Sequence, residues 1–239
     1  MQVLSQKMWS GTADTIAFVQ FQSKSKRLKE GPGINIAGYV NGDDSLVLHY
    51  NFDQKSIKDQ SVYKRGNAVK GNLDMGKGLS GKSVVLSAHN SFIQLPLKEI
   101  GYNYTISFQI KPYQAPAGEK ILFSTENATV KSADQDGKLG FSREGYDYQF
   151  DYKLPLDQWT LITITGNNNG TSLFVNGKLQ ERLLRKKVLF QDSKSKMFKM
   201  QTLVFPLQTL GGGENGFIGE IDELKIYNKV LTDKEIGGL

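Results

Sequence analysis

Cysteine is absent from this 239-residue chain, which excludes disulfides and thiolate metal sites. No stretch approaches the roughly 18 consecutive apolar residues that a membrane span needs, so we expect no membrane span. The first residues also lack the basic start and long apolar core of a signal peptide. They indicate either a protein that stays inside the cell or a piece of a longer exported one. Histidine is scarce: His49 and His89 are the only two, and neither lies in a recognisable triad motif.

The positive charge is the next feature, because a net charge of +6 raises the question of a nucleic-acid partner. Most basic residues are spread along the chain. One local group consists of Arg182, Arg185, Lys186, Lys187, Lys194, Lys196 and Lys199. This group fits a solvated loop or strand face, or a patch for an acidic glycan or a partner domain. No nucleic-acid motif accompanies it, so we expect no nucleic-acid partner.

Glycine is abundant, with 25 residues, and it recurs in Asn-Gly, Asp-Gly and Gly-Gly pairs that supply the positive φ of tight hairpins. Between these pairs lie short segments that are typical of strands. They are 46–52, 83–86, 91–95, 104–110, 120–124, 138–141, 148–152, 159–165, 171–175, 201–205, 216–222 and 223–227. The pattern predicts an all-β protein, an antiparallel jelly-roll β-sandwich. A capping box from Thr232 to Glu235 predicts one final helical turn.

The first thirty residues have a different character. Residues 12–28 contain neither glycine nor proline, and their apolar residues follow helical spacing until Gly31-Pro32-Gly33 ends the pattern. We therefore divide the chain into a short N-terminal helical segment (1–33), a linker (34–44) and a β-sandwich (45–239).

Several strand segments, taken in order, resemble those of laminin-G-like domains with the concanavalin A-like jelly roll. The clearest are Tyr104-Thr-Ile-Ser-Phe-Gln-Ile-Lys-Pro112, Gln158-Trp-Thr-Leu-Ile-Thr-Ile-Thr165, Ser172-Leu-Phe-Val-Asn-Gly-Lys178 and Gly219-Glu-Ile-Asp-Glu-Leu-Lys-Ile-Tyr-Asn228. Leu48-His-Tyr-Asn-Phe-Asp53 resembles the opening strand. The ordered set covers residues 45–239 and implies the same fold as the strand pattern.

A second resemblance lies in the helical segment. Val3-Leu-Ser-Gln-Lys-Met-Trp9 looks like the last barrel helix of family 20 glycoside hydrolases, the β-N-acetylhexosaminidases, and residues 21–36 resemble the segment beyond it. The resemblance implies that 1–33 is the end of a catalytic barrel. The sandwich would then be the C-terminal accessory domain of an exported bacterial enzyme, periplasmic or extracellular, with its own catalytic domain as a partner. The alternative is an ordinary amphipathic helix that packs on the sandwich.

Acidic residues give little support for catalysis in this chain. Family 20 enzymes use an adjacent Asp-Glu pair on a barrel strand. Asp222 and Glu223 are adjacent, but successive strand residues point to opposite faces, so the two converge only if a bulge intervenes, and we expect Glu223 to face solvent. Concanavalin-like glucanases align three carboxylates on one strand face; here Glu220 and Asp222 fill two positions and Leu224 the third. We expect no enzyme activity from this chain, and a structural role for His49.

A structural calcium ion is one cofactor that the resemblance implies, because such sandwiches often tie the first strand to the last through calcium. Its candidate ligands are Asp53, Asp59 and Asp222. In the alternative reading, Asp59 begins a turn and Asp222 hydrogen-bonds a neighbouring loop.

Carbohydrate binding needs aromatic and polar side chains together on a surface. The period-two segment 146–152 places Tyr146, Tyr148, Phe150 and Tyr152 on one face, which is either core or a glycan platform. The sequence thus predicts a non-catalytic accessory module that binds carbohydrate or packs on a catalytic domain. The alternative is a structural or protein-interaction sandwich without a glycan ligand.

Overall fold

The computed structural model describes residues 44–54, 57–66, 68–97, 100–113, 118, 120–133, 137–143, 146–167, 169–184 and 205–239. Residues 45–239 form one compact unit. The helical segment 1–33 and nearly all of the linker 34–44 lie outside the described residues, so both remain predictions. Within the described ranges, no helix is long and apolar enough to cross a bilayer.

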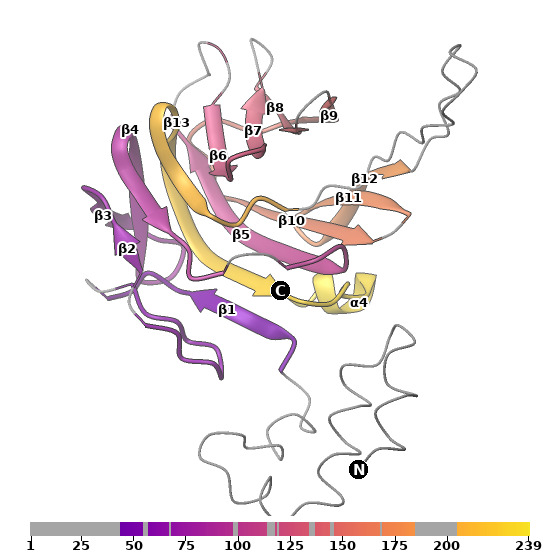
Figure 1. The fold of residues 1–239 in the computed structure, drawn as a ribbon, viewed down its shortest axis with the longest axis horizontal. Helices are drawn as coiled ribbons and strands as arrows, with labels where there is room; N and C mark the ends of the chain where they lie inside the picture. The colour runs from indigo at the N-terminus through magenta and orange to yellow at the C-terminus, as the bar shows by residue number, and fades with distance from the viewer. Residues whose placement is uncertain are drawn as a thin grey trace, which may run out of the picture. The chain divides into compact units, whose positions relative to one another are not determined.

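The described residues form thirteen strands and one short helix, which confirms the all-β prediction (Figure 1). The elements are β1 (Leu46–Tyr50), β2 (Val69–Lys70), β3 (Asp74–Lys77), β4 (Lys82–Gln94), β5 (Tyr104–Pro112), β6 (Lys120–Ser124), β7 (Ala128–Ala133), β8 (Lys138–Arg143), β9 (Tyr146–Lys153), β10 (Thr160–Asn167), β11 (Gly170–Val175), β12 (Lys178–Leu184), β13 (Thr209–Tyr227) and α4 (Asp233–Ile236).

Strand β13 connects the two layers of the sandwich. The strand order is β12-β11-β10-β5-β13-β6-β7-β8-β9, and the pairings are antiparallel. The first part of β13 pairs with β6 from Thr209 to Gly216, and its second part pairs with β5 from Gly219 to Tyr227. Figure 1 shows the strand arching between the layers. Gly211, Gly212 and Gly213 all have positive φ, which allows the sharp curvature.

The core lies between these layers and is rich in aromatic residues. Phe123 of β6 packs edge-on against Phe108 of β5 and against Phe205, with ring centroids 5.4 and 5.1 Å apart. Alternate residues of β5 (Ile106, Phe108 and Ile110) are fully buried, as the period-two pattern requires. The intervening residues of β5 therefore point to the outer face of the same sheet.

The C-terminal segment covers one end of that outer face. Ile236 of α4 and Leu231 pack with Phe174 and Tyr227 in a small separate cluster. The backbone N–H of Leu231 donates to Thr105 Oγ1 at 2.9 Å. The predicted capping box is confirmed, because the Thr232 hydroxyl accepts from the backbone of Glu235 and the Glu235 carboxylate accepts from the backbone of Thr232.

Most predicted strands are confirmed, and the hairpin of β10 and β11 pairs from Ile162 with Val175 to Asn167 with Gly170. Two differences concern length. Strand β4 is continuous where the sequence predicts two strands, and β13 begins at Thr209, before the adjoining predicted segments 216–222 and 223–227. Four mainly polar strands, β2, β3, β7 and β12, were not expected. Residues 201–204 of the expected strand 201–205 lie outside the described residues.

Candidate functional site

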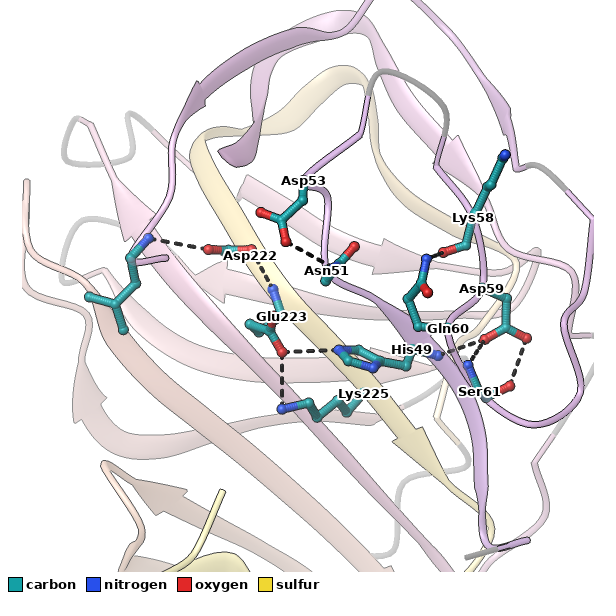
Figure 2. A network of polar contacts seen from close by, with 11 residues as sticks. His49, Asn51, Asp53, Lys58, Asp59, Gln60, Ser61, Asp222, Glu223 and Lys225 are labelled. Atoms are coloured by element: carbon teal, nitrogen blue, oxygen red, sulfur yellow. Dashed lines mark hydrogen bonds and ion pairs between the residues drawn. The ribbon is translucent and has the colours of Figure 1, made fainter. Parts of the chain in front are cut away.

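The polar residues of greatest interest lie where β1 meets β13. Figure 2 shows this β1–β13 polar network, which we define as His49, Asp53, Asp59, Asp222, Glu223 and Lys225. Strand β13 pairs with β4 up to Ile221 and then with β1 from Leu224 onward. Because β13 changes partner at this point, the first strand, the last strand and the loops beside them meet here.

A β-bulge marks the change of partner. The register with β5 shifts between Asp222 and Lys225, and Glu223 has φ of 50°. The bulge breaks the alternation on which the sequence reasoning depended. Glu223 is therefore not a freely solvated residue: its side chain is about one-third exposed and is paired on two sides. The expectation that Glu223 faces solvent therefore holds only in part, because the partly exposed carboxylate is paired with His49 and Lys225.

Glu223 is held by two cationic or potentially cationic groups. Its Oε2 lies 3.0 Å from Nε2 of His49 and 3.0 Å from Nζ of Lys225. The hydrogen bond to His49 and the contact with Lys225 outweigh partial burial and lower the pKa of Glu223 to about 2. The carboxylate is thus ionised and engaged inside the network. His49 has a structural contact, in line with the role expected from the sequence.

The carboxylate of Asp59 is occupied by hydrogen bonds from its own loop and from β1. Its buried carboxylate accepts hydrogen bonds from the backbone N–H of His49 (3.0 Å), the backbone and hydroxyl of Ser61 (both 2.8 Å) and the backbone of Arg65 (3.0 Å). Burial alone raises the pKa of Asp59, but these four donors outweigh it and lower the pKa. Asp59 thus begins a turn, as the alternative reading proposed, and it has little capacity left for a metal.

Asp53 and Asp222 lie against a common glycine turn. The backbone N–H of Leu79 donates to Asp222 Oδ2 at 3.2 Å, and that of Lys82 donates to Asp53 Oδ1 at 3.0 Å. A Cβ at Gly78 would lie 2.5 Å from Asp222 Oδ2, and one at Gly81 would lie 1.8 Å from Asp53 Oδ1. Only residues without a side chain allow both carboxylates to approach the turn this closely.

The ionised form of Asp222 is disfavoured by its surroundings. The residue is fully buried, and burial together with the nearby charges of Glu223 and Asp53 raises its pKa to about 6. Of the three predicted calcium ligands, Asp53 and Asp222 therefore fit a cation, because the neighbouring charge of Asp53 makes ionisation of the buried Asp222 more costly. Asp59 does not fit. Among the described residues, no group of three or more acidic or histidine side chains is arranged to hold a metal.

The predicted glycan platform on β9 belongs largely to the core. Tyr148 is 8% exposed, and its ring centroid lies 5.1 Å from that of Phe141; Phe150 is buried as well. Tyr152 is half-buried, and burial raises its pKa. The Tyr146 side chain lies outside the described residues. Tyr148 is thus not available to stack on a sugar, which corrects its candidacy.

Glu220 occupies the outer face two residues before Asp222. It is 3% exposed and is bound by Lys111, Ser83 and Tyr113. The sequence identifies Glu220 only as a candidate catalytic acid and gives no sign of these partners. The register of β13 on β5, which pairs Glu220 with Lys111, is what brings them together. Of the basic group 182–199, the structure describes Arg182, whose Nε donates to Ser172 Oγ at 3.1 Å.

A family model of the concanavalin A-like lectin/glucanases superfamily, of the laminin-G type, matches residues 87–237. The chain therefore belongs to this superfamily. No curated protein matches the chain in sequence.

Solved structures share the fold. Domain 4 of AbnA, a GH43 extracellular arabinanase from Geobacillus stearothermophilus solved with arabinotriose, is 24% identical, with a TM-score of 0.61 over 81% of this chain and 97% of that chain. The binding domain of Paraclostridial Mosquitocidal Protein 1 is 18% identical (TM-score 0.59), over 82% of this chain and 52% of that chain. The ligand-binding domain of botulinum neurotoxin serotype D, solved with N-acetylneuraminic acid, is 18% identical (TM-score 0.58), over 82% and 50%. This chain spans about half the length of the two toxin chains.

Proposed function

We propose that this chain is a non-catalytic carbohydrate-binding accessory module of a glycoside hydrolase. The observation that supports this most is the likeness to domain 4 of the arabinanase, which extends over 97% of that domain. The arabinanase domain was solved with an oligosaccharide, arabinotriose, and the serotype D neurotoxin domain was solved with a monosaccharide, N-acetylneuraminic acid.

The state of the acidic residues supports the non-catalytic part of the proposal. Glycosidases of the usual type need one carboxyl group that donates a proton and a second, accessible one that acts as nucleophile or base. Here Glu220, Glu223 and Asp59 have lowered pKa values because internal donors hold their charged forms. Asp222 has the raised pKa that suits an acid, but its side chain is fully buried. Asp59, Glu220 and Asp222 are buried, and the partly exposed Glu223 is paired with His49 and Lys225.

The parent enzyme in this proposal is a β-N-acetylhexosaminidase, which would be periplasmic or extracellular. The support is the resemblance of Val3–Trp9 and residues 21–36 to the end of a family 20 barrel. The catalytic domain of the parent would then be a partner of the sandwich.

A glycan array tests the proposed function. We expect the labelled 239-residue chain to bind a subset of immobilised oligosaccharides, and to release no product from soluble oligosaccharides or from aryl N-acetylhexosaminides. Binding to no glycan would favour the alternative of a structural or protein-interaction sandwich. Hydrolysis by the purified chain would contradict the non-catalytic assignment.

We also propose that Asp53 and Asp222 bind calcium at the glycine turn, with remaining oxygen ligands from backbone or water. Calcium would neutralise two neighbouring carboxylates that otherwise repel each other. Asp59 takes no part in this site.

Asp222→Asn tests the calcium site through stability. Because the folded-state pKa of Asp222 is raised above its ordinary value, its ionisation destabilises the fold as pH rises from about 4 through 6. In Asp222→Asn the amide keeps one acceptor for the two backbone donors, Leu79 and Glu223, at any pH. In chelator, the free energy of unfolding of Asp222→Asn relative to the wild type should therefore rise by on the order of 2 kcal/mol from pH 4 to pH 8.

Calcium should stabilise only one of the two proteins in the same denaturation experiment. At pH 8 it should raise the melting temperature of the wild type and leave that of Asp222→Asn unchanged. If calcium leaves the wild-type melting temperature unchanged, the metal site is wrong. If the stability of Asp222→Asn relative to the wild type in chelator does not rise between pH 4 and pH 8, the account of the buried charge is wrong.

A further inference from the structure

A compact group of aromatic and charged side chains lies on the outer face of the sheet, at the end of β5. We call Lys111, Tyr113, Asp157, Trp159 and Glu220 the Tyr113 cluster. Nζ of Lys111 lies 5.5 Å from the centroid of the Tyr113 ring and 5.2 Å from that of the Trp159 ring. Both distances fall within the range of a cation–π contact, so the ammonium group holds the two rings near each other.

The buried carboxylate of Glu220 holds this arrangement in place. Its carboxylate pairs with Lys111, accepts the Ser83 hydroxyl, and accepts the Tyr113 hydroxyl at 2.7 Å. Gly76 makes room for it, because a Cβ there would lie 2.2 Å from Glu220 Oε2. The buried acid therefore fixes the orientation of Tyr113 and Lys111 before any ligand arrives, which reduces the entropy that binding must overcome.

Three side chains of the cluster reach the solvent. Tyr113 is 39% exposed, Trp159 is half-buried and Asp157 is exposed. Asp157 has φ of 54°, and its backbone N–H donates to Pro112 O at 2.7 Å, which fixes the loop beside Tyr113. A non-glycine residue in this conformation is strained, and such strain gathers at binding sites. A cross-strand ion pair between Lys111 and Glu220 alone would require neither the exposed rings nor the strained loop.

We propose that Tyr113 and Trp159 form a subsite for an uncharged sugar ring, with Asp157 and Lys111 as partners for its hydroxyl groups. This inference rests on the proposed function and names the site and the ligand class. The aromatic rings offer apolar surface to the C–H face of a sugar, and the adjacent charged groups offer hydrogen bonds that orient it. The three formal charges of Lys111, Asp157 and Glu220 sum to −1, so an anionic sugar is disfavoured.

Titration calorimetry on the full chain tests this subsite. The probes are arabinotriose, N-acetylglucosamine trisaccharide and the matched pair of lactose and sialyllactose. Tyr113→Ala and Trp159→Ala should each weaken binding of the neutral sugar about tenfold or more, as the loss of a central aromatic contact does. Tyr113→Phe should keep most of the affinity, because the ring remains. Tyr102→Ala is the matched control, since Tyr102 is 48% exposed just before β5, at its opposite end, and should leave binding unchanged.

The possible results distinguish a failure of the subsite from a failure of the proposed function. If the wild type binds sugar but Tyr113→Ala and Trp159→Ala behave like Tyr102→Ala, the subsite is wrong and the function stands. Equal losses in Tyr113→Phe and Tyr113→Ala, with melting temperatures unchanged, would also overturn the role of the ring. Tighter binding of sialyllactose than of lactose would overturn the preference for uncharged sugars. If the wild type binds none of the four probes and no glycan of the array, the proposed function fails with the subsite.

Discussion

Replacing Asp59 with alanine should lower the free energy of unfolding by about 3 to 5 kcal/mol. The buried carboxylate accepts four hydrogen bonds, and its loss leaves donors of His49, Ser61 and Arg65 without an acceptor beside a buried strand. Because the donors belong to one network, their losses are coupled and should appear as a single large effect. Urea denaturation followed by tryptophan fluorescence and circular dichroism measures the difference.

Asp53→Ala is the matched control for this variant. Asp53 is exposed and accepts two hydrogen bonds, from Asn51 and Lys82, so we expect a loss below about 1 kcal/mol in chelator. The loss in Asp59→Ala should be the same with calcium and with chelator. If Asp59→Ala loses stability only in the presence of calcium, the structural role of Asp59 is wrong and Asp59 is a calcium ligand.

Removing the charge of Lys111 should have the second large effect. Lys111→Met leaves the buried carboxylate of Glu220 without its cation, which should lower the free energy of unfolding by about 3 kcal/mol. The expected value lies at the low end of the range for buried pairs, because the Lys111 side chain is itself 22% exposed. Thermal and urea denaturation at neutral pH, where Glu220 is ionised, measure it.

The double variant Lys111→Met/Glu220→Gln separates charge from packing. Glutamine carries no charge. It keeps an acceptor oxygen for one of the Ser83 and Tyr113 hydroxyls, and its NH2 group can donate to the other hydroxyl, so the double variant should recover most of the lost stability. If the double variant is no more stable than Lys111→Met alone, the uncompensated charge of Glu220 is not the cause. In that case the hydrocarbon stem of Lys111 and its contacts with the two rings would dominate.

The sandwich could be predicted from sequence because its signals are local. Alternating polarity and Gly-containing turns identify β5, β10 and β11 directly, and Thr232 to Glu235 identifies the last turn of helix. The continuous course of β13 could not be predicted in the same way. Gly211 to Gly213 suggest a break, but here their positive φ values bend one long strand that both layers share.

The candidate site was predicted only in part, because its contacts depend on register and on one bulge. Asp53 and Asp222 do lie at one place, but the donors that occupy Asp59 include the backbone of His49, ten residues away, and no sequence pattern shows that contact. The bulge at Glu223 rotates its side chain toward His49 and Lys225. The Tyr113 cluster requires Lys111 and Glu220 to be paired across strands, which becomes visible only when the register is known.

The most direct measurement of the central claim is a calorimetric titration of the full chain with neutral oligosaccharides, with the same samples then analysed for cleavage products. We expect saturable binding of at least one neutral oligosaccharide and complete recovery of that oligosaccharide uncleaved. Cleavage of the ligand, or the absence of binding to every neutral oligosaccharide together with a native melting transition, would contradict a non-catalytic carbohydrate-binding module.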